Sequence, residues 1–259
     1  MFYQNKNSNN LKKTLVVLNP SESRRLIARA VVNIPCVQNA YKKGRIIIIG
    51  STTNAFVVEE LTGQKINKYY YASGLISQGK LGGNPPDVRL KPLVFKDCVQ
   101  QNIHPNEMVK EFTANDVYIK SANAVDPEGN AGILMSSETG GTIGASIGIL
   151  NARGSHLITP VGLEKMIPSV IKASTKCGRE TFLKATGDPA GYMPLVNSKV
   201  VTEIEALRML SDVEATHVAS GGVNGSEGAV TLVLEGSEDQ VNKGFEIVNE
   251  IKGEPAIKP

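Results

Sequence analysis

Three polar segments rich in glycine follow hydrophobic runs and contain residues that could bind an anion or move a proton. The first is Gly50-Ser51-Thr52-Thr53-Asn54, between the isoleucine run 46–49 and a segment of helical character. Backbone N–H groups at a helix start bind anions, and serine and threonine hydroxyls add donors. The segment therefore predicts an anion-binding turn, with a plain strand-to-helix turn capped by a hydroxyl as the alternative. It is not a GxxxxGK[ST] phosphate loop.

The second segment, 120–130, lies at the carboxyl end of the expected strand 117–120 and contains Asn123 and Asp126. Open α/β sheets bind ligands at the carboxyl ends of their strands, so both side chains are candidate catalytic residues. Asn123 would orient or polarise a substrate, and Asp126 would transfer protons. Asp-Pro and Glu-Gly-Asn are also ordinary turn sequences, so turn formation explains the segment equally well.

The third segment, 136–144, offers Glu138 as a candidate general base and Gly140, Gly141 and Thr142 as anion-binding donors. A capping acid near a helix start is the alternative role for Glu138. The long loop 72–92, rich in glycine and proline, adds Lys80 and Arg89, which could close over an anionic ligand or remain solvated.

Around these three segments the sequence predicts strands and helices in alternation. The isoleucine run shows no period-two alternation, which is typical of a central parallel strand covered on both faces. The alternation predicts an α/β fold with a doubly wound, mostly parallel sheet. We expect strands at 15–18, 46–49, 92–95, 117–120 and 155–160, and helices at 20–41, 52–61, 106–112, 147–152 and 163–174.

The composition changes near residue 187, which predicts two domains. Residues 1–187 would form the α/β domain that binds a small molecule. Residues 188–259 show the order strand, helix, strand, strand, helix, which indicates a ferredoxin-like α+β domain. Its expected elements are strands at 193–196, 216–220, 229–235 and 256–257, helices at 202–210 and 238–252, and a glycine-rich hairpin at 221–228.

Composition limits the classes of partner. The net charge of +3 and the lack of a dense basic run argue against nucleic acid. The three cysteines are widely spaced without a CxxC pair, and the three histidines lack metal-ligand spacing. We therefore expect a cytoplasmic homo-oligomer that binds a small anionic ligand, uses no metal or cofactor, and contacts neither nucleic acid nor membrane.

Three segments also occur in a suggestive order: GRIIIIGSTTNA at 44–55, DVYIKSANAVDPEGN at 116–130 and GSHLITP at 154–160. Together they resemble the superfamily of ribose-phosphate isomerase, methylthioribose-phosphate isomerase, initiation-factor-like regulators and CoA-transferases, over about residues 24–165. Isomerases of this group carry a Gly-x-Gly-Ser-Thr phosphate turn, which residues 50–53 resemble. The resemblance implies a phosphate site there, and Glu138 as a candidate for the glutamate nucleophile of CoA-transferases.

The chain departs from the isomerase pattern at two places. Asn123 stands where the isomerases carry a catalytic aspartate, and an amide cannot shuttle a proton as a carboxylate does. The lysine expected after the following turn is replaced by the apolar stretch 131–133. Two functions follow: an enzyme acting on a phosphorylated or carboxylated metabolite, or a non-catalytic ligand sensor or assembly protein built on the same fold.

Overall fold

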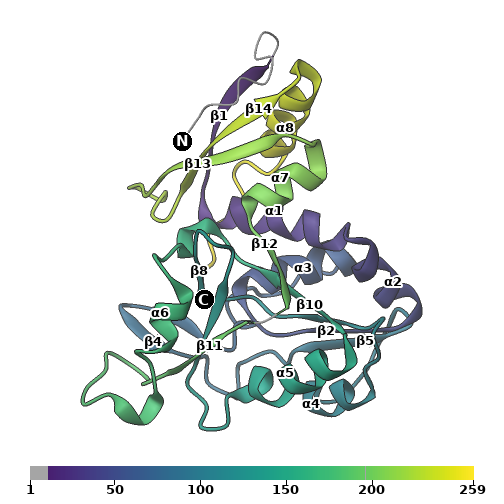
Figure 1. Ribbon diagram of the computed structural model, residues 1–259, viewed down its shortest axis with the longest axis vertical. Helices are drawn as coiled ribbons and strands as arrows, with labels where there is room; N and C mark the ends of the chain where they lie inside the picture. The colour runs from purple at the N-terminus through teal and green to yellow at the C-terminus, as the bar shows by residue number, and fades with distance from the viewer. Residues whose placement is uncertain (1–10, 196) are drawn as a thin grey trace.

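A six-stranded mixed sheet forms the centre of the larger part of the molecule (Figure 1). The computed structural model describes residues 11–195 and 197–259. Within this sheet β12, β10, β7 and β2 run parallel in that order, while β5 pairs antiparallel with β2 and β6. The strands are β2 (Arg45–Ile48), β5 (Leu93–Lys96), β6 (Val99–Gln100), β7 (Val117–Ile119), β10 (His156–Pro160) and β12 (Ser198–Val201).

Helices cover both faces of this sheet because its central strands are apolar on both sides. Ile46 and Ile48 share a buried cluster with α1 (Pro20–Val32), α2 (Pro35–Lys43) and α3 (Thr52–Thr62). Ile47 and Ile49 face the opposite cluster, which includes residues of α4 (Pro105–Met108), η1 (Val109–Glu111) and α5 (Gly141–Arg153). The predicted α/β fold with a mostly parallel sheet is confirmed at this level.

Proline and asparagine set the helix boundaries near the N-terminus. Asn19 and Glu22 form a capping box around Pro20, which is the first residue of α1. The helix expected over 20–41, with Pro35 as its expected kink or end, is two helices, because α1 ends at Val32 and Pro35 begins α2. Similarly, the helix expected over 163–174 is a short 3-10 turn, η2 (Leu163–Lys165), followed by α6 (Val170–Ser174).

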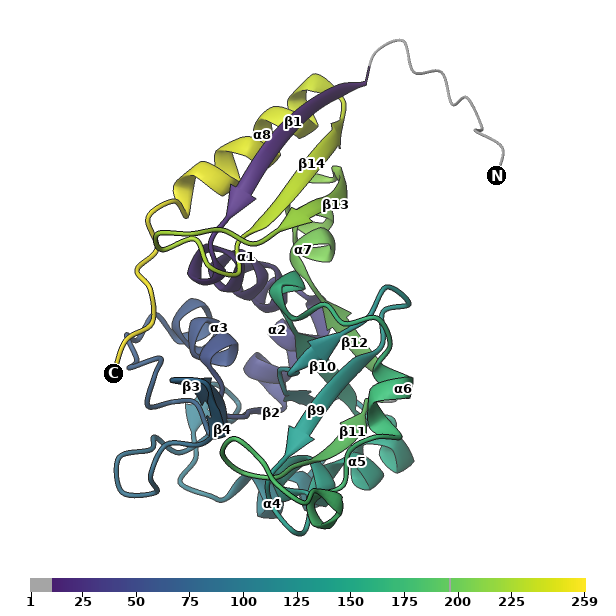
Figure 2. The same ribbon diagram turned by 90° about the vertical axis from the view of Figure 1, so that its left-hand side faces the viewer.

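Two segments expected to be irregular contain strands. The glycine-rich stretch 123–144 includes β8 (Ala124–Val125) and β9 (Ala131–Met135), which form an antiparallel sheet with β11 (Gly191–Pro194). The loop 72–92 includes the hairpin of β3 (Leu75–Ser77) and β4 (Lys80–Gly82). Figure 2 shows this hairpin and the β9–β11 sheet on either side of the lower half of the molecule.

A smaller unit lies above the large sheet in Figure 1 and combines both ends of the chain. Its sheet has the order β1-β14-β13, with both pairings antiparallel. The elements are β1 (Lys12–Leu18), α7 (Glu203–Ser211), β13 (Glu214–Ser220), β14 (Val230–Gly236) and α8 (Glu238–Glu250). β1 is an edge strand with apolar residues on both faces: Val16 and Leu18 are buried, whereas Leu15 and Val17 on its other face are exposed.

The strand pairings do not follow the division expected at residue 187. β1, from the start of the chain, completes the small sheet, while β11 and β12 pair with strands of the larger part. The strand expected at 193–196 corresponds to β11, and residue 196 lies outside the described residues. Residues 256–257 are irregular instead of a strand.

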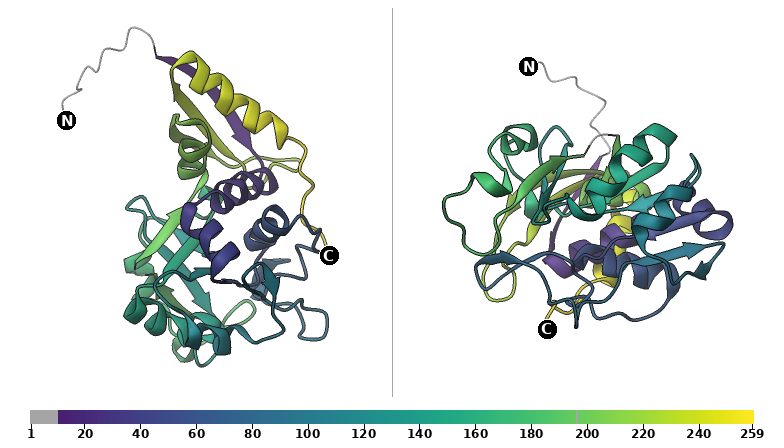
Figure 3. Two further views of the ribbon diagram at one scale, coloured as in Figure 1. Left: turned by 90° about the vertical axis from the view of Figure 1, so that its right-hand side faces the viewer. Right: turned by 90° about the horizontal axis from the view of Figure 1, so that it is seen from below.

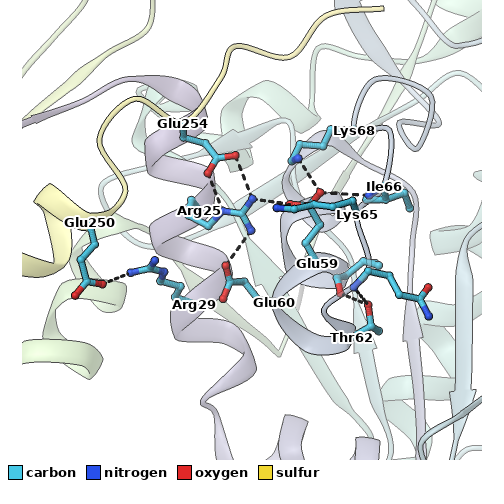
Figure 4. Close-up of polar contacts among 12 residues, drawn as sticks. Arg25, Arg29, Glu59, Glu60, Thr62, Lys65, Ile66, Lys68, Glu250 and Glu254 are labelled. Atoms are coloured by element: carbon cyan, nitrogen blue, oxygen red, sulfur yellow. Dashed lines mark hydrogen bonds and ion pairs between the residues drawn. The ribbon is translucent and has the colours of Figure 1, made fainter.

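The segment after α8 runs back beside the larger part of the molecule (Figure 3) and joins the two units. Lys252 bonds to Glu22, and Glu254 accepts hydrogen bonds from the buried Arg25 of α1. Arg25 also bonds to Glu59 and Glu60 of α3, as Figure 4 shows. One guanidinium therefore neutralises carboxylates from two segments far apart in the sequence. Over the described ranges, no helix is long and apolar enough to cross a membrane.

Candidate functional site

A cavity of about 690 Å³ opens at the carboxyl ends of β2 and β7. Cavities of this volume accommodate small organic ligands. Its wall is built from the turn after β2, the segment after β7, β9 with the start of α5, and the loop that contains β3 and β4. The lining residues include 50–52, 73–74, 81–86, Arg89, 120–123, 133–137, 140–143, Lys165 and Asp188.

The turn after β2 brings only its first three residues to the cavity. Ser51 caps α3 by accepting a hydrogen bond from the Asn54 N–H at 3.0 Å, and Thr52 is the first residue of the helix. Asn54 is buried behind the turn, where its amide donates to the carbonyls of Ile49 and Ile119 and ties β2 to β7. Thr53 is likewise buried and does not line the cavity.

Gly50 is required by packing against the loop above it. A Cβ atom at this position would lie 2.4 Å from the Tyr71 carbonyl oxygen and 2.7 Å from the Ser73 hydroxyl oxygen. The absence of a side chain therefore lets the 71–73 segment lie directly over the strand end. Ser73 of this segment lines the cavity beside Gly50 and Ser51.

The N-terminus of α5 faces the same cavity. Its cap is Gly140, which has no side-chain acceptor, and both Gly140 and Gly141 have positive φ angles of 76° and 60°. Glycine adopts this conformation without the strain that a side chain would cause. Gly140, Gly141, Thr142 and Ile143 all line the cavity. The partial positive charge of the helix start therefore faces the cavity without a capping side chain.

The charged side chains that line the cavity are mostly cationic. Arg89, Lys120 and Lys165 are the cations, and Asp188 is the carboxylate. Burial lowers the pKa of Lys120 to about 8. Burial, followed by the nearby charge of Arg24, lowers the pKa of Lys165 to about 8. The field in the cavity therefore favours an anion.

Of the two lysines, only Lys165 has a polar partner within the part of the chain that the structure describes. Its ammonium donates to the Ala122 carbonyl at 3.1 Å. Lys120 has no hydrogen bond or ion pair from its ammonium among the described residues. A half-buried ammonium without a partner carries a desolvation cost that a bound anion would offset.

The predicted catalytic residues occupy three different environments. Asn123 lines the cavity, and its Oδ1 accepts a hydrogen bond from the Leu134 N–H at 3.0 Å, which leaves the amide nitrogen as a donor. Asp126 is buried away from the cavity. It accepts hydrogen bonds from the Val170 N–H at 2.9 Å, from two nitrogens of Asn130 and from the Glu128 N–H.

These donors change the acidity of Asp126. Burial alone would raise the pKa of the carboxyl, but the hydrogen bonds, above all from the Val170 N–H, lower it below its ordinary value. A carboxylate held in this way organises its own turn and is poorly placed to accept a further proton. The turn-forming alternative from the sequence describes this environment.

Glu138 lies outside the cavity, with 78% of its side chain exposed, and its Oε1 is 3.6 Å from a guanidinium nitrogen of Arg179. Lys80, in β4, is also exposed and does not line the cavity, whereas Arg89 from the same loop does. The cavity thus gathers most of the predicted anion-binding residues and one predicted catalytic residue. These are Gly50, Ser51, Thr52, Arg89, Asn123, Gly140, Gly141 and Thr142.

Lys120 belongs to the segment 120–130 that the sequence singled out, but it was given no role, and none was given to Lys165, His104 or Asp188; all four line the cavity. Lys120 had a signal, because it directly follows the apolar strand Val117–Ile119 at the edge where ligands bind. The other three are brought in from distant segments. Across residues 11–195 and 197–259, no three His, Cys, Asp or Glu side chains gather as a metal site.

Comparison with known proteins adds no relative from which a function could be transferred. No protein-family model matches this chain, and neither a curated protein nor a solved structure matches it. The function must therefore be argued from the cavity.

Proposed function

We propose that this protein is an enzyme that binds a small phosphorylated or carboxylated metabolite in the cavity at the carboxyl ends of β2 and β7. The observation that carries the proposal is the half-buried ammonium of Lys120 in a cavity whose other charged walls are also mainly cationic. An anion would offset the desolvation of this ammonium, and the N-termini of α3 and α5 would add backbone donors.

The residues around the cavity suggest separate roles. Ser51, Thr52 and the start of α5 would hold the anionic group. The free amide nitrogen of Asn123 would donate to an oxygen of the substrate, and Lys120 and Asp188 are groups able to transfer a proton. Isomerase-like or CoA-transferase-like chemistry fits this arrangement, with Lys120 and Asp188 in place of Asp126 and Glu138.

We also infer the finer classification of the two units. Helices on both faces of the large sheet support a doubly wound arrangement. In the small unit, β14 lies between β1 and β13 and is antiparallel to both, which supports a ferredoxin-like unit whose first strand is β1. The three free cysteines support a cytoplasmic location.

A non-catalytic assembly protein is the second candidate, and the open face of the small sheet favours it. Leu15 and Val17 of β1 are 60% and 43% exposed, and Val218 of β13 is 50% exposed. Apolar side chains on an open sheet face are typical of a surface that another chain covers, which would also give the expected homo-oligomer.

A thermal-shift assay tests the anion site. Inorganic phosphate, sugar phosphates, CoA thioesters and dicarboxylates are each added to the purified protein. A ligand at about 100 times its Kd adds roughly 2.7 kcal/mol of stability and raises the Tm by several degrees. We expect such a rise with at least one anion, and its loss in the double variant Ser51→Ala/Thr52→Ala.

Ser169→Ala is the matched control, because Ser169 caps α6 as Ser51 caps α3 but does not line the cavity. It should lose stability and keep the ligand response. An unchanged Tm with every anion would refute the anion site. Turnover of a stabilising ligand would favour the enzyme, whereas a ligand-dependent change in molar mass by light scattering without turnover would favour the assembly protein.

A further inference from the structure

We propose that Lys120 is a nucleophile that forms an imine with the carbonyl carbon of an anionic aldehyde or ketone bound in the cavity. This inference rests on the proposed function and narrows its substrate class to carbonyl compounds that carry a phosphate or carboxylate. The argument depends on where Lys120 lies, on what its ammonium lacks, and on how the other cations of the cavity are occupied.

Lys120 is held at a fixed place on the sheet. It directly follows β7, which lies between β2 and β10, and its backbone N–H donates to the Ile158 carbonyl at 3.0 Å. Lys120 lines the cavity next to this anchored backbone. A group on the end of a central strand has a better defined position than one on a mobile loop, as a nucleophile requires.

The lack of a partner distinguishes Lys120 from other shielded cations of the molecule. Arg25 bonds to three carboxylates, and Lys68 pairs with Glu59 at 2.8 Å. Each of these groups is stabilised in its charged form. Lys120 has no comparable partner in the part of the chain described here, and burial lowers its pKa to about 8, which raises the fraction of the neutral amine, the nucleophilic form, above that of an exposed lysine.

The other cations of the cavity are better suited to binding the anion. Arg89 remains charged at all physiological pH values. Lys165 is oriented by its bond to the Ala122 carbonyl, and Glu164 and Glu203 partly offset the effects of burial and of Arg24 on its pKa. The cavity thus provides fixed positive groups for a phosphate or carboxylate, and a separate amine for the carbonyl.

The proposed step is a condensation that balances without an oxidant or reductant. The lone pair of the Lys120 amine attacks the carbonyl carbon, a C–N bond forms, and the carbonyl π electrons move to oxygen. Proton transfer gives a carbinolamine, which loses its hydroxyl group as water to form the imine. Asp188 and His104 line the same cavity and are the groups that would carry these protons.

Reductive trapping on the intact protein tests this proposal. The probe is glycolaldehyde phosphate with sodium cyanoborohydride, which reduces an imine to a stable secondary amine, and labelled lysines are located by peptide mass spectrometry. We expect Lys120 to be labelled at least ten times faster than Lys65, whose side chain is 85% exposed. The labelling rate of Lys120 should rise with pH, with an apparent pKa near 8.

Two controls separate this proposal from the proposed function. Inorganic phosphate should slow labelling of Lys120 and leave Lys65 unaffected, and the preference for Lys120 over Lys65 should be smaller with glycolaldehyde, which lacks the phosphate. Lys120→Arg cannot form the imine, so selective labelling should disappear in this variant while Lys65 is labelled at its usual rate.

The outcomes are distinguishable. A phosphate-dependent rise in Tm with Lys120 labelled no faster than Lys65 would overturn the imine and leave the anion-binding function standing. Fast labelling of Lys120 that phosphate does not slow, without any phosphate effect on Tm, would overturn both the anionic substrate class and the anion-binding function. Selective labelling at Lys165 instead of Lys120 would also overturn the assignment.

Discussion

Replacement of Arg25 by methionine should destabilise the protein strongly, because the Arg25 side chain is buried and pairs with three carboxylates. The guanidinium lies 2.5 Å from Glu59, 2.9 Å from Glu60 and 3.0 Å from Glu254, and its central carbon is 4.7 Å from the centre of the Phe56 ring. Only 3% of the Glu59 side chain is exposed. Methionine fills much of the same volume but leaves the buried carboxylate of Glu59 with fewer cationic partners.

The magnitude follows from the loss of one partner of a buried ion pair, which costs roughly 3–5 kcal/mol. In a protein of this size each kcal/mol lowers the Tm by about 2–4 °C, so Arg25→Met should lower it by roughly 10 °C. Lys68 still bonds to Glu59 at 2.8 Å, which places the expected loss at the lower end of the range. Urea unfolding followed by circular dichroism measures the free energy directly.

Arg29→Met is the matched control, because Arg29 is also on α1 and pairs with Glu250 at 2.7 Å, but with 29% and 62% of the two side chains exposed. An exposed pair contributes about 0–1 kcal/mol. The double variant Arg25→Met/Glu59→Gln should recover part of the loss, since it removes the uncompensated charge. Equal losses in the two single variants would refute the reasoning that burial of Glu59 sets the cost.

Two further predictions concern buried carboxyl groups. Asp126→Asn leaves the N–H groups of Val170 and Asn130 with a weaker acceptor, so it should lower the free energy of unfolding in urea by about 2 kcal/mol. The phosphate-dependent rise in Tm should persist, and a folded variant without that rise would place Asp126 in the binding site. Burial raises the pKa of Glu203 to about 7, above its unfolded value near 4.3, so the folded protein retains a proton that the unfolded chain releases. The free energy of unfolding should therefore fall as pH rises from about 4.3 to 7, and this loss should be absent in Glu203→Gln. Urea unfolding at pH 5 and pH 8 measures it, and an equal change in free energy between the two pH values in the original protein and in Glu203→Gln would contradict the prediction.

The local pattern of the sequence predicted the elements that are decided locally. The isoleucine run identified β2 because all of its central residues are apolar, and Asn19-Pro20-Ser21-Glu22 marked the start of α1. Partner choice was not predictable in the same way. The apolar residues of β1 do not alternate with polar ones, so their sequence reads as a strand buried on both faces, although one face is open.

In the candidate site, too, the features set by local sequence were predicted and those set by distant residues were not. The turn at 50–52 and the helix start at 140–142 were visible as glycine next to hydroxyl residues, and both line the cavity. The environments of Asp126 and Glu138 depend on Val170 and Arg179, which are more than 40 residues away, so their types alone could not separate a turn-forming acid from a catalytic one. The low pKa of Lys120 depends on burial, which a single sequence does not reveal.

The position of β1 has a consequence for synthesis on the ribosome. β1 is made first, but its partner β14 is made more than 200 residues later. Until then its backbone N–H and C=O groups and the side chains of Val16 and Leu18 lack their native cover, while the large sheet between β1 and β14 can already fold. Completion of the small unit therefore requires residues as far as β14 to have left the ribosome, so it follows synthesis of the large sheet.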